Sequence, residues 1–380
     1  MSECSICFPK ERAIKINADI SEGNITQRAV AEKYGINYYT LRGHIRKGHI
    51  NSVSSTGHLG ASGATEKIKA ELLSAVTSIK HTVPQVIKIG PDDLSKNGSI
   101  IHIMIPDTQC SPADSESPET PSDHIAWEGQ YLVDQFYGKN VKLVVIGDWW
   151  DMSSLSSYDR GRREFEGRRV INDLVKGNDD FNTFNAPMEK QYDLDVKNGK
   201  QPWMPDKYFT DGNHEDRLTR AISTSPELDG LLSLDMMDVE KHGYNRSPYL
   251  KVVELDGISY SHVFVNPMTG KPYSGQNLST RLQTIGKSFT MGHQQQLLIA
   301  QRYVMGKSQH GLVCGANYIH SESYKGWQGN AHFRGIVVCH GVSNGSYDIM
   351  VVSLDFLCRK YEGVSLDRFV SKKYPKLWRP

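Results

Sequence analysis

The sequence has few cysteines, no long apolar run and almost no net charge. Its six cysteines in 380 residues form no regular framework, which argues against a disulfide-stabilised scaffold. No apolar run reaches about eighteen residues, and neither a signal peptide nor an internal repeat is apparent. A formal net charge of +1 excludes a chain that attracts nucleic acid as a whole. We therefore expect a protein of a reducing cytosolic compartment, without membrane insertion, whose binding preferences come from local patches.

Length and composition predict two globular units joined by a linker. We expect a small domain over residues 1–50, a linker with one helix over 51–97 and a larger domain over 98–380. The segment Asn51–Ala64 is rich in Ser, Gly and Thr, as flexible linkers are. Apolar residues at helical spacing over Glu66–Lys80 predict a helix that packs on the larger domain. Pairing with another subunit is the alternative.

Five short polar motifs occur in order along the larger domain. They are Asp107-Thr108-Gln109, Gly147-Asp148-Trp149-Trp150-Asp151, Gly212-Asn213-His214-Glu215, Ser261-His262 and Gly292-His293-Gln294-Gln295. The first three follow strand-like runs, which are Ile101–Pro106, Val141–Ile146 and Lys207–Thr210. Side chains released at neighbouring strand ends can converge, and a mixture of Asp, Asn and His suits Mn²⁺, Fe or Zn²⁺. The series therefore predicts a two-metal phosphoesterase site.

On these motifs the chain resembles the calcineurin-like metallophosphoesterases, whose motifs run D-x-H, G-D-x-x-D, G-N-H-(E/D), a lone His and G-H-x-H. The resemblance covers roughly Ile101 to Phe356. It implies an α/β fold, the four-layer α/β/β/α metallophosphoesterase sandwich, here joined to a small N-terminal all-α helix-turn-helix domain. One such fold serves phosphatases, nucleotidases and nucleases alike, so the fold does not choose the substrate.

The resemblance also implies a role for each motif residue. The first metal would be bound by Asp107, Gln109 and Gln295, the bridging ligand would be Asp148, and the second metal would be bound by Asn213, His262 and His293. His214 would contact the phosphate or the leaving oxygen, with Asp151 holding its ring. Such a site hydrolyses phosphate esters with two metals about 3.5–4 Å apart and needs no covalent enzyme intermediate. His214 would act as the general acid.

Two departures from the family pattern fall on the same metal. Both histidines expected at the first metal are glutamines here, Gln109 and Gln295. An amide oxygen ligates hard cations but lacks the affinity of imidazole for Zn²⁺ or Fe, so we expect a weak, exchangeable first metal, Mn²⁺ first and Mg²⁺ second. The alternative is a decayed site. Decay should remove ligands of both metals, whereas here both missing histidines belong to the first metal.

The amino-terminal segment carries a second set of candidate ligands. Cys4 and Cys7 form a C-x₂-C pair, and His44 and His49 form an H-x₄-H pair. Between them, the pattern of residues over Thr26–Arg42 is typical of a helix-turn-helix, with Ala31 at the helix crossing, Gly35 at the turn and Asn37 as a cap. We expect one structural Zn²⁺ to stabilise this small domain, which resembles short zinc-bearing modules of phage and bacterial proteins. The alternative is two free thiols in a flexible terminus.

Candidate nucleic-acid contacts form two groups. The first lies on or after the predicted recognition helix and comprises Tyr38, Tyr39, Arg42, Arg46 and Lys47. The second follows the Gly-Asp-Trp-Trp-Asp motif and comprises Arg160, Arg162 and Arg163. A solvated charged helix is the alternative for both groups. Trp149 and Trp150 could stack on a base, although packing is the commoner use of such residues.

Two further stretches of the larger domain have predictable structure. The polar insertion Phe165–Trp203 is expected to form helices that cap the site. The alternating stretches Gly335–Cys339 and Tyr347–Leu354 are expected to be closing strands of the second sheet.

These observations predict a metal-dependent phosphodiesterase or nuclease that acts on DNA and is targeted by its amino-terminal module. One alternative is a small-substrate phosphatase or cyclic-nucleotide phosphodiesterase, and another is a DNA-binding scaffold without turnover. The pairing of domains resembles bacteriophage proteins, which implies the cytoplasm of an infected bacterium. DNA is the expected partner, and a homo-oligomer is compatible with the sequence.

Overall fold

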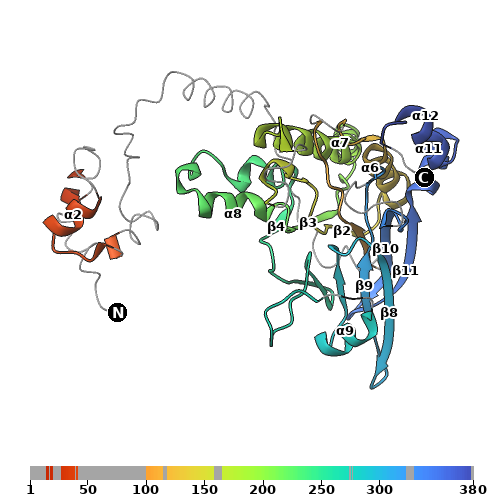
Figure 1. The fold of residues 1–380 in the computed structure, drawn as a ribbon. Helices are drawn as coiled ribbons and strands as arrows, with labels where there is room; N and C mark the ends of the chain where they lie inside the picture. Colours follow the sequence, from red (N-terminus) through yellow and green to blue (C-terminus); the bar gives the residue numbers. More distant parts are fainter. Residues whose placement is uncertain are drawn as a thin grey trace. The chain divides into compact units, whose positions relative to one another are not determined.

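The structure of the protein is a computed structural model (Figure 1). It describes residues 14–16, 18–19, 27–38, 40–41, 100–113, 118–157, 165–273, 275, 277–321 and 329–377. The chain divides into two units, Met1–Glu71 and Leu72–Pro380, which are treated separately below. The predicted domain boundaries after residues 50 and 97, and the linker with its helix, lie outside the described residues.

The amino-terminal unit contains the helix α2 (Gln27–Lys33). Its end is marked by Gly35, whose φ of +60° is the left-handed conformation that glycine adopts without strain at helix ends. A small apolar cluster forms the core of this unit and comprises Ile16, Val30, Ala31 and Leu41. At its edge the hydroxyl of Tyr34 donates to Asp19 at 2.7 Å.

The second unit is built on a six-stranded mixed sheet. In spatial order its strands are β11 (Ser346–Ser353), β10 (Gly335–Ser343), β1 (Ile100–Ile105), β2 (Val141–Val145), β3 (Asp206–Thr210) and β4 (Asn245–Ser247). The run from β1 to β4 is parallel, and β10 and β11 are antiparallel. The central strands are buried on both faces, which explains their nearly continuous apolar sequence.

A second mixed sheet has five strands. In spatial order they are β5 (Val253–Leu255), β6 (Ile258–Tyr260), β7 (Phe289–Met291), β9 (Lys307–Cys314) and β8 (Leu297–Val304). Here β6 runs parallel to β7, and β7 runs parallel to β9. The unit is therefore of the mixed α/β class.

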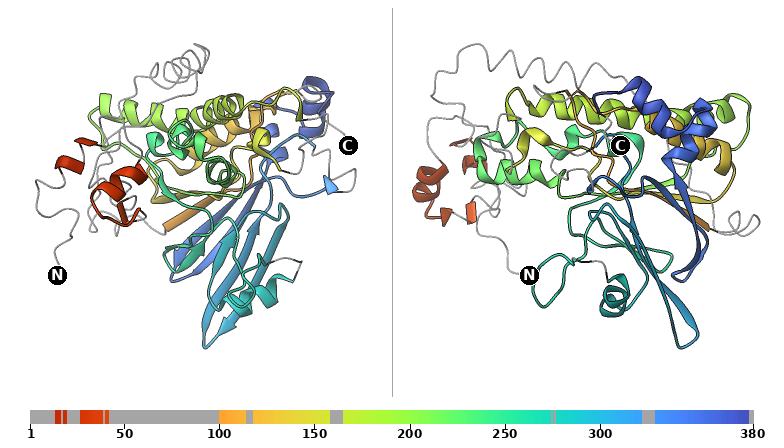
Figure 2. Two further views of the ribbon diagram at one scale, coloured as in Figure 1. Left: turned by 60° about the vertical axis from the view of Figure 1, so that its left-hand side comes forward. Right: turned by 45° about the vertical axis from the view of Figure 1, so that its right-hand side comes forward.

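Helices cover the outer faces of the two sheets (Figures 1 and 2). The α-helices are α6 (Asp123–Phe136), α7 (Val170–Lys197), α8 (Asp216–Thr224), α9 (Leu278–Ile285), α11 (Leu354–Glu362) and α12 (Leu366–Lys373). The short 3₁₀ helices are η1 (Ser153–Leu155), η3 (Pro226–Leu228), η4 (Leu234–Met236) and η5 (Glu240–His242). Most pack on the six-stranded sheet, whereas α9 packs on the five-stranded one. Among the described helices, none combines the length and apolar character that crossing a bilayer requires.

The two sheets pack face to face through alternate residues of their strands. On β1, Ile103 and Ile105 face the helices, whereas Met104 faces the second sheet, where it meets a cluster that includes Tyr260 and Leu312. The alternation follows from the two-residue period of a strand. Each fully buried side chain of this size contributes about 1.5–3 kcal/mol of transfer free energy. The interface between the sheets is therefore a true core of the unit.

The strands near the carboxyl end differ from the sequence-based expectation. The stretches Gly335–Cys339 and Tyr347–Leu354 do form strands, but β10 and β11 belong to the six-stranded sheet and not to the second sheet. The reason is that β10 pairs directly with β1, with Met104 opposite Val337. Alternation in a sequence identifies a strand and its buried face, but not the strand with which it pairs.

The polar insertion also departs from its predicted position. It forms the single long helix α7, which lies behind the Trp149 loop and contributes no residue to the wall of the candidate site. The indole nitrogen of Trp149 donates to the carbonyl oxygen of Gly177 at 3.1 Å. A Cβ on Gly177 would lie 1.8 Å from the ring of Trp150. Both tryptophans are fully buried packing residues, which excludes stacking on a base.

A buried histidine joins the two sheets. The Nδ1 atom of His102, on β1, lies 2.6 Å from the hydroxyl of Tyr260, on β6. Its Nε2 atom lies 2.8 Å from the carboxylate of Asp256, which also accepts a hydrogen bond from Lys142 at 2.5 Å. Burial lowers the pKa of His102 to about 4, against the opposing charge of Asp256. The imidazole is therefore neutral in the folded protein at neutral pH.

This burial predicts an acid-sensitive interface between the sheets. Between about pH 6.5 and pH 4 the unfolded chain binds a proton at His102 that the folded chain excludes, so stability falls as the pH falls through this window, by about 3 kcal/mol in total. Urea unfolding across this range should show a weaker pH dependence for His102→Phe than for the wild type, although the variant is less stable at neutral pH. The partly exposed His340→Phe is the control, and an unchanged slope in His102→Phe would contradict the prediction.

Candidate metal centre

The five motifs lie in the loops that follow five strands. Asp107, Asp148 and Asn213 follow β1, β2 and β3 of the first sheet, whereas His262 and His293 follow β6 and β7 of the second. Within each sheet these strands are parallel, so their carboxyl ends meet at one edge. The strand pairing thus brings together residues that are far apart in the sequence.

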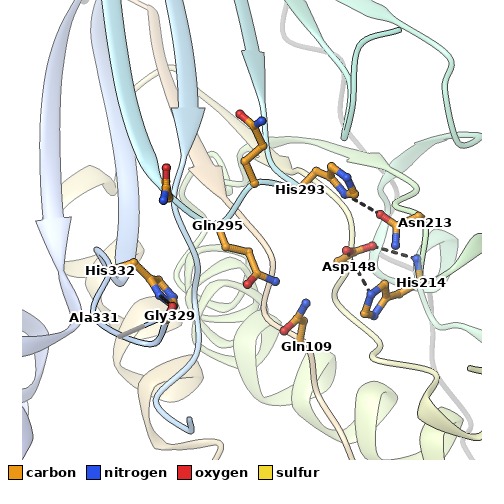
Figure 3. Close-up of a pocket in the computed structure, with 11 residues that line it drawn as sticks. Gln109, Asp148, Asn213, His214, His293, Gln295, Gly329, Ala331 and His332 are labelled. Atoms are coloured by element: carbon orange, nitrogen blue, oxygen red, sulfur yellow. Dashed lines mark hydrogen bonds and ion pairs between the residues drawn. The ribbon is translucent and has the colours of Figure 1, made fainter. Parts of the chain in front are cut away.

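A pocket of about 380 Å³ opens at this edge (Figure 3). It is lined by Gln109, Asp148, Asn213, His214, His293, Gln294, Gln295, Gln296, Gly329, Ala331 and His332. The predicted ligands Asp107 and His262 are buried beneath it and do not line it. In Figure 3 the side chains of Gln109 and Gln295 extend toward each other from opposite walls.

One group of ligand atoms has the spacing of a metal site. The Nε2 atom of His262 lies 3.2 Å from an oxygen of Asp148 and 3.1 Å from Oδ1 of Asn213, and Nδ1 of His293 lies 2.8 Å from the same Asn213 atom. The ligand atoms of Asp148, His262 and His293 all lie within 4.8 Å of one another. Atoms that share one divalent ion at roughly 2.0–2.2 Å lie about 3 Å apart, so this set fits a single cation.

The tautomer of His262 is set by its other nitrogen. Nδ1 lies 2.7 Å from the carbonyl oxygen of Ile146, which can only accept, so Nδ1 carries the hydrogen and Nε2 faces Asp148. Such an arrangement is typical of a ligating histidine. Burial opposes the proton on His262, but the charge of Asp148 raises the pKa of His262 to about 10.

The predicted first metal has an oxygen-rich set. Oδ1 of Asp107 and Oε1 of Gln109 are buried acceptors that receive no hydrogen bond. Two buried acceptors without a donor fit a hard cation, as the glutamine substitution predicts. Gln295 lies opposite and accepts a hydrogen bond on Oε1 from the hydroxyl of Tyr318 at 3.0 Å. Burial raises the pKa of Asp107 to about 7, and the adjacent charge of Asp148 acts in the same direction.

The loops of the site have strained backbones. Gln109, Asp148, His293 and Gln295 all have φ between 50° and 68°, in the left-handed region that side chains rarely adopt. Strain of this kind costs about 1–3 kcal/mol per residue and persists only where the surroundings enforce it. The concentration of such residues around one pocket therefore indicates a functional site.

The glycines of the motifs allow the loops to approach one another. A Cβ on Gly212 would lie 2.1 Å from Oδ1 of Asp148, and one on Gly292 would lie 2.6 Å from Oδ2 of Asp107. Neither contact is sterically allowed. These two positions explain why glycine precedes the Asn-His and His-Gln pairs.

The predicted pair of His214 and Asp151 lies together beside the metal cluster. Nδ1 of His214 is 3.0 Å from a carboxylate oxygen of Asp151, and its Nε2 is 3.1 Å from Arg217 and 3.7 Å from Asp148. Burial favours the neutral form of His214, but the carboxylates of Asp148 and Asp151 raise the pKa of His214. Burial likewise favours a neutral Asp148, yet His214 and His262 hold the pKa of Asp148 well below its usual range. The cluster therefore combines the carboxylate anion of Asp148 with two histidines, His214 and His262, that can donate protons.

Glu215 has a structural role that the sequence did not reveal. Its buried carboxylate accepts four backbone N–H groups, from Asp148 at 2.9 Å, Trp149 at 2.7 Å, Trp150 at 3.1 Å and Gly212 at 2.7 Å. Burial raises the pKa of Glu215, while these N–H groups oppose the rise. Its place in the Gly-Asn-His-Glu motif was the only available signal. The pocket residues Gln294, Gln296 and His332 were also not predicted.

Most of the predicted zinc ligands and nucleic-acid contacts fall on undescribed parts of the chain. Outside the described residues lie Cys4, Cys7, His44, His49, Tyr39, Arg42, Arg46, Lys47, Arg160, Arg162 and Arg163. Tyr38 is described: its ring is partly buried against the small core and lies 6.0 Å from the guanidinium of Arg28.

Comparison with known proteins adds no assignment. No protein-family model matches the chain, and no curated protein matches it significantly. The functional argument therefore rests on the motifs and on the geometry of the site.

The four hydrogen bonds to Glu215 predict that Glu215→Gln weakens the metal centre. The amide keeps the shape but has one acceptor oxygen, so its NH₂ must oppose the backbone N–H groups on one side. We expect Mn²⁺ affinity, measured by calorimetry, to fall about 10- to 100-fold, as for other residues that orient metal ligands.

The control for this variant is Asp216→Asn at the next position, where the carboxylate pairs with the exposed Arg220 at 3.0 Å. A surface pair of this kind contributes about 0–1 kcal/mol, so Mn²⁺ affinity should be unchanged. Equal losses in both variants would show that Glu215 does not organise the site.

Proposed function

We propose that the protein is a metal-dependent phosphodiesterase or nuclease of the calcineurin-like metallophosphoesterase type that acts on DNA. One observation carries this proposal. Loops that follow four strands of two sheets bring Asp148, Asn213, His262 and His293 together. The His262–Asp148, His262–Asn213 and His293–Asn213 pairs lie 2.8–3.2 Å apart, and the ligand atoms of Asp148, His262 and His293 lie within 4.8 Å of one another, which suits ligands of one cation. Asp107 and Gln109 stand beside them with unpaired buried oxygens.

The proposed fold is the four-layer α/β/β/α metallophosphoesterase sandwich with a small helix-turn-helix domain before it. The layer order supports it: helices including α6 and α7 lie on the six-stranded sheet, that sheet packs on the five-stranded sheet, and α9 lies beyond. In the amino-terminal unit the helix α2, the turn at Gly35 and the hydrogen bond from Leu41 N to Asn37 O agree with the proposed module.

Two divalent ions are the proposed cofactors of the site. Asn213, His262 and His293 would hold one, Asp107, Gln109 and Gln295 would hold the other, and Asp148 would join them. Mn²⁺ is the first candidate and Mg²⁺ the second, because the set of Asp107, Gln109 and Gln295 offers only oxygen ligands. When bound, such ions supply charge that stabilises the attacking and leaving oxygens of a phosphoryl transfer.

His214 is the proposed proton donor of the reaction. Asp151 holds its Nδ1 atom at 3.0 Å, so the ring presents Nε2 toward Asp148 and the metal cluster. Nε2 accepts a hydrogen bond from Nη2 of Arg217 at 3.1 Å in this structure. It would give a proton to the leaving oxygen of a bound phosphodiester only as the imidazolium, with Arg217 moved away. Arg217, which donates to the carbonyl oxygen of Asp151 at 2.7 Å, fixes the loop on which Asp151 lies.

The amino-terminal module is the proposed source of DNA targeting. A Zn²⁺ held by Cys4, Cys7, His44 and His49 would stabilise it, and its basic residues would contact phosphates. The bacterial cytoplasm of a phage infection is the proposed location. The choice of DNA over smaller esters depends on this module, because the metal centre alone serves either substrate.

The proposal predicts DNA cleavage that requires both the metal and His214. Supercoiled, linear and single-stranded DNA are incubated with the protein in Mn²⁺, Mg²⁺ or EDTA. Nicking or degradation should occur with Mn²⁺ and be abolished by EDTA. Loss of a general acid lowers reaction rates by about 10²- to 10⁴-fold, so the cleavage rate of His214→Ala should fall by at least about 10²-fold. Asp148→Asn should abolish cleavage.

The His340→Ala variant, outside the pocket, is the control and should cleave normally. Intact DNA with hydrolysis of bis-para-nitrophenyl phosphate would instead indicate a small-substrate phosphodiesterase or phosphatase. No hydrolysis of any phosphoester, with DNA still bound, would contradict the proposal and indicate a scaffold.

A further inference from the structure

The backbone of the first motif is held by a buried asparagine. Asn317, just after β9, is fully buried, and its main-chain N–H donates to the carbonyl oxygen of Asp107 at 2.9 Å. Its side-chain nitrogen donates to the hydroxyl oxygen of Thr108 at 3.4 Å. One residue thus binds two consecutive residues of the motif, and the second of these stands directly before Gln109. Asn317 therefore fixes the backbone between the two candidate ligands of the first metal.

Two residues of α6 in turn hold Asn317. Oε2 of Glu128 accepts a hydrogen bond from the side-chain nitrogen of Asn317 at 3.0 Å, and Nε2 of His124 lies 3.0 Å from its main-chain oxygen. This oxygen can only accept, so Nε2 of His124 carries the hydrogen. Glu128 and His124 are four positions apart and share one face of the helix. A chain of hydrogen bonds therefore runs from α6 through Asn317 to the first motif.

The two residues of α6 are uncharged in the folded protein. Burial raises the pKa of Glu128 to about 8, and burial lowers the pKa of His124 to about 3. At neutral pH the carboxyl group is therefore mainly protonated and the imidazole is neutral. Their contacts with Asn317 are hydrogen bonds between neutral groups, which depend on direction and so specify a geometry.

The cluster of Asn317, Glu128 and His124 is not the most stable filling for this part of the core. Among the described residues, Oδ1 of Asn317, Oε1 of Glu128 and Nδ1 of His124 are buried and meet no hydrogen-bond partner. Each such atom costs stability, because it has left water without gaining a partner. Apolar residues would fill the same core without this cost. Stability alone does not account for three polar residues here, whereas the geometry that they give to the first motif does.

We propose that Asn317, held by Glu128 and His124, is a positioning residue that fixes the Asp107-Thr108-Gln109 loop for the first metal ion. The inference rests on the proposed function, in which the first and last residues of this loop bind that ion. It assigns α6 a role in metal binding although no residue of α6 lines the pocket. Loss of the cluster should weaken binding of the first metal ion and spare the second.

The test measures Mn²⁺ binding to the full chain by calorimetry, without substrate. We expect a stronger and a weaker binding event in the wild type, and Gln109→Asn, which shortens one ligand, should weaken the event that belongs to the first metal. Asn317→Leu removes the side-chain donors but keeps the main-chain N–H. It should weaken the same event by about 10- to 100-fold, as is usual for residues that orient metal ligands, and leave the stronger event unchanged.

Glu128 is tested by graded replacement. Glu128→Gln keeps a neutral side chain with an acceptor for Asn317, so it should retain most of the Mn²⁺ affinity of the weaker event. Glu128→Leu fills the same core without an acceptor and should lose this affinity as Asn317→Leu does. Equal affinities in the two Glu128 variants would contradict the inference, and this pair decides the question if Asn317→Leu does not fold.

The matched control is Asn185→Leu. Asn185 is an equally buried asparagine on α7, outside the pocket, and its side-chain oxygen accepts a hydrogen bond from Lys207 at 2.9 Å. Thermal unfolding should show that both asparagine variants are less stable than the wild type, but only Asn317→Leu should lose affinity in the weaker event. A loss of affinity that follows the loss of stability in both variants would make the cluster structural only and overturn the inference.

Separate outcomes reject the inference and the proposed function. A wild type that binds a single Mn²⁺ ion, or a weaker event that is unchanged in Asn317→Leu, overturns the inference. A wild type that binds two Mn²⁺ ions, and loses the weaker one in Asn317→Leu, but hydrolyses no phosphoester would keep the inference and reject the proposed function.

Discussion

The site depends on a single buried carboxylate that joins two loops. Glu215, just before α8, accepts the N–H groups of Asp148, Trp149, Trp150 and Gly212. These hydrogen bonds fix the distance between the loop after β2 and the loop after β3. Asp148 is left-handed at φ 50°, and hydrogen bonds to a charged acceptor, each about 1.5–3 kcal/mol, are large enough to hold such a conformation. Without this carboxylate four backbone N–H groups of the two loops would lose their acceptor.

The candidate metal centre also depends on the packing between the two sheets. The first sheet supplies Asp107, Asp148 and Asn213, whereas the second supplies His262 and His293. Oxygen and imidazole ligands meet only because Met104, Val144 and Ile146 pack against the second sheet. A core substitution at this interface would therefore change the ligand geometry as well as the stability. The hydrogen bonds of His102 to Tyr260 and Asp256 reinforce the same interface.

Much of the site was predictable from local pattern, and some of the fold was not. Apolar runs ending in Asp107 and Asp148 identified strand ends, because a buried parallel strand is continuously apolar and its functional residues come directly after it. The sheet to which β10 and β11 belong was predicted wrongly, since strand pairing depends on the partner strand. The insertion was correctly expected to be helical, but α7 lies behind the Trp149 loop, where the absence of a side chain at Gly177 leaves room for the ring of Trp150.

The sequence by itself determined which residue types stand at the strand ends, and that glutamines occupy two positions where the calcineurin-like pattern that it resembles has histidines. The need for glycine at Gly212 and Gly292 became clear only in the structure, because a Cβ there would meet Asp148 and Asp107 from other loops. Only the tertiary structure decided which glutamine faces which partner. Glu215 is an ordinary charged residue in the sequence, and its role follows from burial beside particular backbone N–H groups, which depends on how the sheets and helices pack.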